Sequence, residues 1–452
     1  MHGQQEGITY SRAFVFAVAA YALVSMARIH ELVRALQPLR LGMLSAAIVL
    51  IVALGSVRRD VMTELFSSTV GKGAILVVAF TIITIPTGEW PKASFEYVTK
   101  IYYNAVLLFV VAAALFADRR ATRPLITLLV ADIAAAGLFS LVKAQAGRYE
   151  IGVTYDANET ASLFAMTIPW GIYLLLTEKG LPRLLGLIAI PSCLLGVLQS
   201  GSRGGLIGTG ALVPFLVYLS PPRKRAPFVM CVVVGAVLTV MSMGDQAVYR
   251  FRKAFDPDEY NYTTEDGRVE IWKRGLGYIK GSPLLGVGLD GFQYKELNSK
   301  TNTGSGVRQA AAHNMYIQVA AELGLIGFGG FLTMLFGAHV LCGRARRRIK
   351  QWILEGGGAD AERELIRVNM AQASLYSLMC TGFFLSLGYS SMLYFGVGAC
   401  LGVWLASRRL GSGPGRPVTQ APRAGVRGMR GWRSGRPVPV GAGLHGMHSP
   451  QS

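Results

Sequence analysis

Long apolar stretches separated by short polar segments recur along most of this chain. Many of them approach the roughly 20 residues that cross a bilayer as an α-helix, and they lack the short alternating segments of a membrane β-barrel. The pattern predicts an all-α, polytopic membrane helical bundle with about twelve transmembrane helices. The predicted spans are residues 8–27, 39–56, 73–88, 97–117, 122–142, 159–177, 183–199, 204–219, 226–244, 314–341, 367–387 and 389–406.

The ends of the chain raise two separate questions. The first apolar segment ends near Ser25 and Ala27, which resemble a signal-peptide cleavage site. An uncleaved first helix is the preferred interpretation, because the preceding segment is only weakly basic and many spans follow. The tail from Gly411 is rich in Gly, Pro and Arg, which predicts a disordered segment able to contact anionic lipids.

Composition supports the membrane interpretation. Of the 452 residues, 52% are hydrophobic and 16% are charged, whereas soluble proteins have about 25% charged residues. The net charge of +19 is spread over short clusters between apolar segments, so we expect membrane lipids and no nucleic acid as partners. The cysteines form no CxxC pair, which excludes a disulfide framework or a thiolate metal site: Cys193, Cys231, Cys342, Cys380 and Cys400.

The distribution of Lys and Arg predicts the orientation. One set of alternate loops carries "DRRATR", "EKGLPR", "PPRKR" and "GRARRRIK", so these loops and both termini are expected in the cytoplasm. The basic segment 28–40 argues mildly against this assignment. The long loop 245–312 then lies on the outer side as a small subdomain before the tenth helix. Within it, residues 268–280 predict an amphipathic helix with an apolar face of Val269, Trp272, Leu276 and Ile279.

We divide the chain into four regions. Residues 1–150 hold N-terminal transmembrane helices, and 151–341 form a core that includes the outer loop. Residues 342–410 comprise a cytoplasmic loop and the last two transmembrane helices, and 411–452 form the tail.

Several short polar motifs lie at the outer ends of these spans. "GSRGG" (201–205) places Arg203 either as an interfacial side chain or as part of an anion site, since glycines expose backbone N–H groups and Arg offers a bidentate fork. "YDANETA" (155–161) offers Asp156 and Asn158, either as a helix N-cap or as the lining of a cavity. "GRVEIWKRG" (267–275) offers Arg268 and Arg274.

The segment "AAHNMYIQVAAELGLIGF" (311–328) places His313 and Asn314 at the outer start of a span and Glu322 within it. An imidazole with an ordinary pKa of about 6.5 can take a proton from a hydroxyl, so His313 is a candidate general base. We expect it on the helix. Glu322 is expected to be a structural partner of another helix.

Two further motifs have weak functional signals. "GVGLDG" (286–291) matches a dinucleotide fingerprint but lacks the βαβ context that this chemistry requires, so its glycines are expected to form tight turns. The acidic cluster at 256–266 lacks EF-hand spacing, and we expect neither a metal site nor a cofactor.

Taken in order, "YDANETA", "SRGG", "GRVEIWKRG…SPLLGVGLDGF" and "AAHNMYIQVAAELGLIGF" resemble the O-antigen ligase and polymerase superfamily of bacterial envelope membrane proteins. The resemblance covers roughly residues 150–341. It implies transfer of a glycan from undecaprenyl diphosphate to an acceptor hydroxyl of lipid A core or another glycan. The transfer would be metal-independent and inverting, at the periplasmic face of the inner membrane.

The resemblance also implies roles for individual residues. Arg203 and Arg268 match arginines that hold the donor diphosphate, and His313 matches the histidine that activates the acceptor. The substrate-binding set that we expect is Arg203, Arg268, Arg274, Asp156, Asn158 and Asn314.

Other functions remain open at this point. The runner-up is an O-antigen or exopolysaccharide polymerase of the same superfamily. Behind it come a protein O-oligosaccharyltransferase and a polysaccharide transporter, although no internal repeat typical of transporters is evident.

Overall fold

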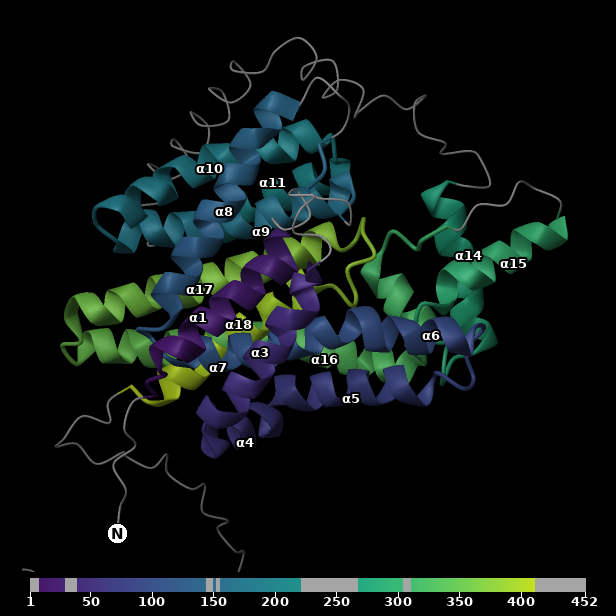
Figure 1. Ribbon diagram of the computed structural model, residues 1–452, viewed down its shortest axis with the longest axis horizontal. Coiled ribbons are helices and arrows are strands. Elements are labelled where there is room, and N and C mark those ends of the chain that lie inside the picture. The colour runs from purple at the N-terminus through teal and green to yellow at the C-terminus, as the bar shows by residue number, and fades with distance from the viewer. Residues whose placement is uncertain are drawn as a thin grey trace, which may run out of the picture.

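The computed structural model describes residues 8–28, 39–143, 149–151, 155–220, 267–303 and 310–410. Within these ranges every regular element is a helix and none is a strand, as the hydrophobic pattern predicts (Figure 1). The elements are α1 (Arg12–Ala22), the π-helical turn η1 (Leu23–Ala27), α3 (Leu41–Ser56), α4 (Arg59–Ser67), α5 (Thr69–Ile83), α6 (Pro91–Tyr97), the π-helical turn η3 (Val98–Tyr102), α7 (Tyr103–Ala117), α8 (Thr122–Lys143), α9 (Ala157–Thr177), α10 (Leu181–Ser200), α11 (Arg203–Leu219), α14 (Arg268–Gly281), α15 (Gly291–Thr303), α16 (Met315–Leu354), α17 (Gly358–Thr381) and α18 (Ser391–Arg408).

The predicted number of about twelve spans is not confirmed. In the described ranges, five helices are long and apolar enough to cross a membrane, or six if α3 and α4, bent by 106° at their junction, form one span. Other apolar helices, such as α5 and α11, are shorter than the roughly 20 residues of a perpendicular span. The predicted span 226–244, the acidic cluster 256–266 and the tail 411–452 lie outside the described residues.

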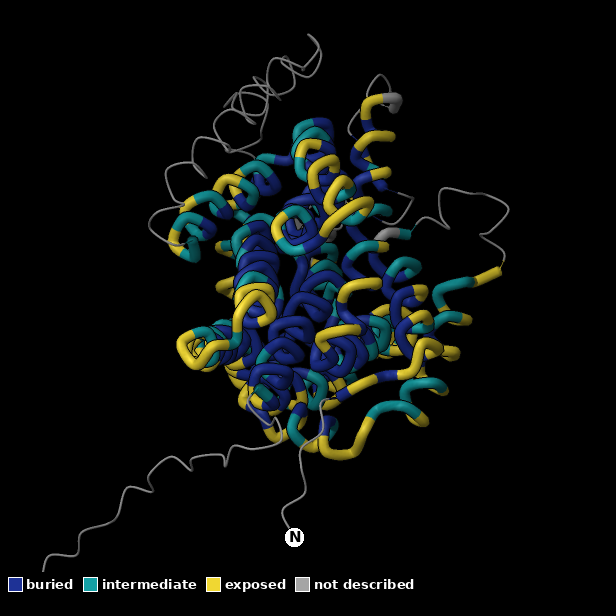
Figure 2. The backbone as a smooth tube through the Cα atoms, turned by 90° about the vertical axis from the view of Figure 1, so that its left-hand side faces the viewer, coloured by how far each residue is buried: buried dark blue, intermediate teal, exposed yellow. Residues whose placement is uncertain are grey.

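The core lies where α7, α9, α16, α17 and α18 pack together, and buried segments fill the middle of the molecule (Figure 2). α18 approaches α7 closely because two glycines lie on its contact face. A Cβ atom on Gly398 would lie 2.5 Å from the carbonyl oxygen of Phe109, and one on Gly402 would lie 2.6 Å from that of Ala113. Small residues that allow backbones to approach are typical of packing between membrane helices.

Apolar side chains are also exposed at the periphery. On α3 only Ala46 and Val49 are buried, whereas Ile51 and Leu54 expose 70% and 79% of their surface. A surface of this kind is unfavourable in water and favourable against lipid tails. Together with the apolar helices, it indicates a multi-pass membrane protein.

α16 differs from the expected single helix over 314–341. It begins at Met315, continues to Leu354 and is interrupted at Gly324, which has φ 66° and ψ −179°. The segment 343–350, expected in a cytoplasmic loop, is therefore helical. Its charged residues allow the helix to continue beyond the bilayer, because a helix of 40 residues is about 60 Å long while the hydrocarbon core is about 30 Å thick.

The interruption in α16 is filled by the backbone of the outer loop. Val287 N–H donates to the carbonyl of Ala321 (2.8 Å), Gly288 N–H donates to that of Glu322 (3.0 Å), and Leu325 N–H donates to that of Pro283 (2.7 Å). These bonds replace those that the break removes from the helix. The "GVGLDG" motif therefore has the structural role that the sequence favours.

Two further expectations are corrected. The last two spans were expected to be separated by only "LGYSS", but α17 ends at Thr381 and residues 382–390 form a longer connection to α18. α14 confirms the expected helix over 268–280, but Ile271 and Gly275 form its buried side, while Val269 and Leu276 are exposed. The sequence of α14 has apolar residues on two sides of the helix. The side with Ile271 and Gly275 is buried because α14 packs against α16.

Candidate functional site

Four helices begin close to one end of the molecule and bring the candidate residues together. α9, α11, α14 and α16 follow Asp156, Ser202, Gly267 and Asn314, respectively. The helices α14 and α15 lie at this end, away from the N-terminus of the chain (Figure 1). Helix N-termini carry partial positive charge and free N–H groups, which favour a bound anion.

His313 lies in the turn before α16, and the expectation that it belongs to the helix is wrong. Its backbone has φ 45°, in the left-handed region, and its N–H donates to Ser386 Oγ at 3.0 Å. The indole N–H of Trp272 donates to the carbonyl of the preceding residue, Ala312, at 2.9 Å. The outer subdomain and the connection after α17 therefore hold the backbone of this turn from two sides.

The electrostatic surroundings of His313 favour its neutral form. Burial lowers the pKa of His313 below its ordinary value, and the positive charge of Arg268 lowers this pKa further. The carboxylate of Asp156 acts in the opposite direction. These effects show that α9, α14 and the turn before α16 bring three of the predicted residues within electrostatic reach. A neutral imidazole at neutral pH can accept a proton.

Arg268 and Arg203 are each the first residue of a helix, α14 and α11. Both are half-buried. α11 begins against the connection that holds His313, since a Cβ on Gly204 would lie 2.8 Å from Cβ of Phe384, two residues before Ser386. Both arginines thus start helices that converge on the His313 turn.

Asp156, Asn158 and Asn314 have local structural roles. Asp156 caps α9 by accepting from the N–H groups of Asn158 (2.8 Å) and Glu159 (2.7 Å), and the Asn158 amide donates to it at 3.2 Å. Asn314 caps α16 by accepting from the N–H groups of two residues of its first turn, at 2.9 and 3.1 Å. Substrate binding by these residues stays a prediction.

Arg274 is turned toward the outer subdomain. It forms a bidentate ion pair with the fully buried Glu296, through Nε at 2.8 Å and Nη2 at 2.7 Å. The hydroxyl of Tyr278 donates to the same carboxylate at 2.7 Å. This network joins α14 to α15, so Arg274 stabilises the position of α14, the helix that begins with Arg268.

Glu322 has the structural surroundings expected from the sequence. Its carboxylate is buried and accepts from the N–H of Phe292, at the start of α15, at 3.4 Å. It therefore joins α16 to the outer subdomain just beside the break at Gly324.

Arg28 was not among the predicted site residues. It has φ 52° at the end of η1, and its guanidinium lies 4.7 Å from the centre of the Tyr155 ring. It is also within electrostatic reach of Glu159 at the start of α9. The signal available in the sequence was the position of Arg28 in a basic segment that the predicted orientation places on the outer side, against the orientation rule.

Residues 187–332 match the family model described as O-Antigen ligase, and this range includes Arg203, Arg268 and His313. The exopolysaccharide production protein ExoQ of Rhizobium meliloti (strain 1021) is 28% identical over 279 residues, which cover 56% of this chain and 61% of ExoQ. A protein of Haemophilus influenzae (strain ATCC 51907 / DSM 11121 / KW20 / Rd), described as uncharacterized, is 24% identical over 192 residues, covering 39% of this chain and 48% of that protein.

The matches thus span about half of one relative and three fifths of the other. Members of the matched family are glycosyltransferase-like ligases or polymerases. The helical bundle, the apolar periphery and the ordered motifs agree with this match. Residues 187–332 therefore match an O-antigen ligase domain, and over this part the chain is similar to the O-antigen ligase superfamily.

Proposed function

We propose that this protein transfers a glycan from undecaprenyl diphosphate to an acceptor hydroxyl of lipid A core or another glycan. The proposal includes a periplasmic site in the bacterial inner membrane, cytoplasmic termini, inversion at the anomeric carbon and independence from metal ions. The observation that carries it is the convergence of Arg268, Asp156 and His313, supported by the family match over 187–332.

In the proposed reaction the acceptor oxygen attacks the anomeric carbon of the glycan from the side opposite the diphosphate. The bond between this carbon and the diphosphate oxygen breaks, and undecaprenyl diphosphate leaves. His313 accepts the proton of the attacking hydroxyl. Arg203 and Arg268 stabilise the negative charge that develops on the leaving diphosphate, which is the role that preorganised cationic donors have in phosphoryl and glycosyl transfer.

The test uses the full-length protein in nanodiscs with an undecaprenyl-diphosphate oligosaccharide, EDTA, and lipid A core as acceptor. We expect Arg203→Ala and Arg268→Ala to lower kcat/KM by about 100-fold or more. His313→Asn is expected to lower it by about 10²- to 10⁴-fold. Asn suits the left-handed backbone at this position, so the substitution removes the base without adding backbone strain.

Lys273→Ala is the matched control, because Lys273 lies on the same helix as Arg268, is largely exposed and pairs with the exposed Glu270. It should transfer glycan at the normal rate. Normal transfer by a folded His313→Asn variant would refute the proposed base, and loss of transfer in EDTA alone would refute metal independence.

A polymerase of the same superfamily is the second candidate, favoured by the similarity to a protein of exopolysaccharide production. The same assay distinguishes the two when a second lipid-linked glycan replaces lipid A core. Lengthening of the lipid-linked glycan identifies a polymerase, and a product on lipid A core identifies a ligase.

A further inference from the structure

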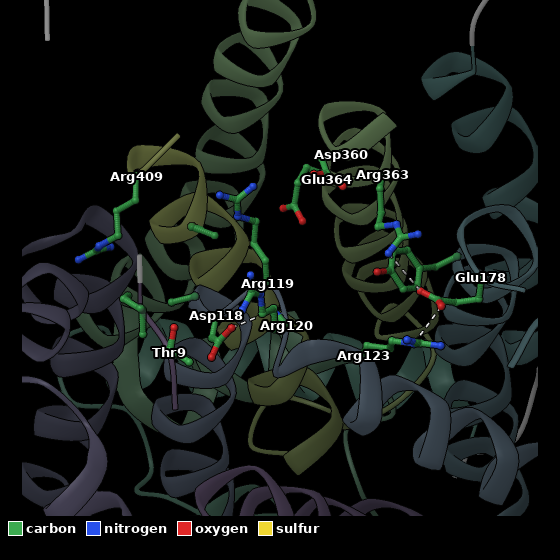
Figure 3. A pocket seen from close by; sticks show the side chains of 14 residues that line it. Thr9, Asp118, Arg119, Arg120, Arg123, Glu178, Asp360, Arg363, Glu364 and Arg409 are labelled. Carbon is green, nitrogen blue, oxygen red and sulfur yellow. Dashed lines mark hydrogen bonds and ion pairs between the residues drawn. The ribbon is translucent and has the colours of Figure 1, made fainter. Parts of the chain in front are cut away.

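A cavity of about 650 Å³ lies among the ends of α7, α9 and α18 and the starts of α8 and α17. Five arginines and four acids line it: Arg119, Arg120, Arg123, Arg363 and Arg409 with Asp118, Glu178, Asp360 and Glu364 (Figure 3). We call it the arginine pocket. Its volume is in the range of pockets that hold small molecules.

The arginine pocket lies far from the candidate site. Asp156 precedes α9 at the His313 end, whereas Tyr173 and Glu178, which line the pocket, lie at the other end of this helix. A helix of 21 residues separates its ends by about 30 Å. The arginine pocket is therefore distinct from the site proposed for glycan transfer. If that site faces the periplasm, as proposed above, the pocket opens toward the cytoplasm.

Two of the four carboxylates in the wall, those of Asp118 and Glu364, hold the surrounding chain in place. Asp118 accepts from the backbone N–H groups of Tyr10, Arg120 and Ala121. Glu364 forms a two-pronged pair with Arg367, at 2.6 and 3.1 Å. These acids are thus committed to fixing the chain around the pocket.

Three of the five arginines, Arg123, Arg363 and Arg409, have acidic partners. Glu178 is shared by Arg123, at 2.9 Å, and Arg363, at 3.9 Å. Arg363 also donates to the carbonyl of Thr177 at 3.0 Å, at the end of α9. Arg409 pairs with Asp60 and Glu64 of α4.

Arg119 and Arg120 carry the inference. Both follow Asp118 in the turn between α7 and α8 and stand in the middle of the pocket wall (Figure 3). In the part of the chain that the structure describes, no carboxylate lies within ion-pair distance of either guanidinium. Arg119 lies 5.4 Å from the centre of the Trp352 ring, which holds it at the cavity through a cation–π contact.

We propose that the arginine pocket binds an anion that carries one or more phosphate groups, gripped by Arg119 and Arg120. Guanidinium groups match phosphate oxygens in charge and in bidentate geometry. The excess of basic residues on the cytoplasmic side of a membrane requires only that arginines lie near the surface. It does not account for two arginines that line a cavity with no carboxylate within ion-pair distance of either guanidinium among the described residues. Both an anionic lipid headgroup and a soluble phosphate compound have the required chemistry.

The test uses the full-length protein in nanodiscs of phosphatidylcholine alone or mixed with phosphatidylglycerol. Inorganic pyrophosphate is titrated into the first, with the midpoint of thermal unfolding as readout. Phosphatidylglycerol that remains bound after transfer to detergent is measured by native mass spectrometry in the second. In the double variant Arg119→Gln/Arg120→Gln, the affinity for pyrophosphate or the amount of retained phosphatidylglycerol should fall about tenfold or more.

Arg347→Gln/Arg348→Gln is the matched control, since it removes two exposed charges from the far part of α16 without altering the pocket. The single variant Arg120→Gln retains the contact between Arg119 and Trp352 and serves if the double variant does not fold. Loss of the pyrophosphate signal alone identifies a soluble ligand, and loss of the lipid signal alone identifies a headgroup. Equal binding by the two double variants, or no binding by the unmodified protein, would overturn the proposal.

Discussion

His313 combines a rare backbone conformation with an environment that keeps its side chain neutral. Its φ of 45° is more accessible to His and Asn than to most residues. The contacts of its backbone to Ser386 and of Ala312 to Trp272 hold the turn in place. The backbone of the turn is therefore held by contacts that a side-chain substitution at His313 leaves intact, so the chemistry of the imidazole can be tested separately from folding.

The pH dependence of transfer should respond to the two charges beside His313. The rate is expected to fall as pH drops through the pKa of His313, because the protonated imidazole cannot accept a proton. Arg268 lowers this pKa and Asp156 raises it. Arg268→Gln should therefore move the acidic limb to higher pH, and Asp156→Asn should move it to lower pH. Profiles of kcat/KM against pH measure both shifts.

Asp156→Asn is a suitable substitution because Asn caps a helix about as well as Asp does. Lys273→Gln, a charge removal elsewhere on α14, should leave the limb unchanged. Limbs that move in the same direction in Arg268→Gln and Asp156→Asn would contradict His313 as the titrating group.

The candidate site could be predicted in part at the residue scale. The motifs indicated His313, Arg203 and Arg268, because these residue types are unusual at the outer ends of apolar segments. The cap roles of Asp156 and Asn314 were partly predictable from their positions before helices. The ion pair of Arg274 with Glu296 and the contact of Arg28 with Tyr155 were not, because each joins side chains whose separation depends on the fold.

Among the elements, the broken helix α16 and the loop that enters the break form one structural unit. Gly324 has φ 66°, and a Cβ atom there would collide with the backbone of Leu284. With ψ −179°, Gly324 lies in a backbone region that is essentially restricted to Gly, and other residue types pay on the order of 1–3 kcal/mol there. Because Val287 and Gly288 bond to the carbonyls beside the break, this unit connects α16 with the outer subdomain that carries Arg268.

Gly324→Ala should destabilise the protein and reduce transfer. The backbone strain and the collision together are expected to cost on the order of 1–3 kcal/mol, and displacement of the loop should move Arg268 away from His313. The midpoint of thermal unfolding in detergent and the transfer rate measure the two effects.

Gly329→Ala is the control on the same helix, because a Cβ atom at Gly329 would meet no atom within 4 Å. It should be neutral or slightly stabilising, since Ala favours the helix over Gly. Equal unfolding midpoints for the two variants would show that the loop does not require Gly324.

On the scale of the whole molecule, the chain places two basic regions at opposite ends of one buried core. The His313 end collects the starts of α9, α11, α14 and α16, and the arginine pocket collects the far ends of α7, α9 and α18. Trp352, which contacts Arg119, lies on the same helix that begins beside His313. This arrangement fits a protein with one polar face on each side of a membrane.

The proposed orientation makes a prediction about accessibility. Lys273 is exposed beside the start of α16, and Arg347 is exposed about nine turns further along α16. In intact cells, a cysteine introduced at Lys273 should react with a membrane-impermeant maleimide once the reagent reaches the periplasm. A cysteine at Arg347 should react only after the inner membrane is permeabilised.

The background variant should carry Cys231→Ser and Cys380→Ser, since the other native thiols, Cys193, Cys342 and Cys400, are buried. Labelling of Arg347→Cys before permeabilisation, with Lys273→Cys protected, would reverse the proposed orientation.

The sequence by itself determined the helical class, the membrane character and the approximate position of most described helices, whereas α4, α6 and α15 were not predicted. These follow from local properties, because a helix satisfies its own backbone and its apolar length alone makes it compatible with lipid. The motifs also identified the residues around which the candidate site is built.

The tertiary structure decided which of these residues meet. The break at Gly324, the buried side of α14 and the place of Arg28 all depend on packing between segments distant in sequence. The number of spans likewise depends on helix lengths and bends that hydropathy does not fix. The apolar pattern shows which residues avoid water. Lipid and the protein core satisfy that preference equally, so only the packed bundle shows which apolar residues face lipid and which lie in the core.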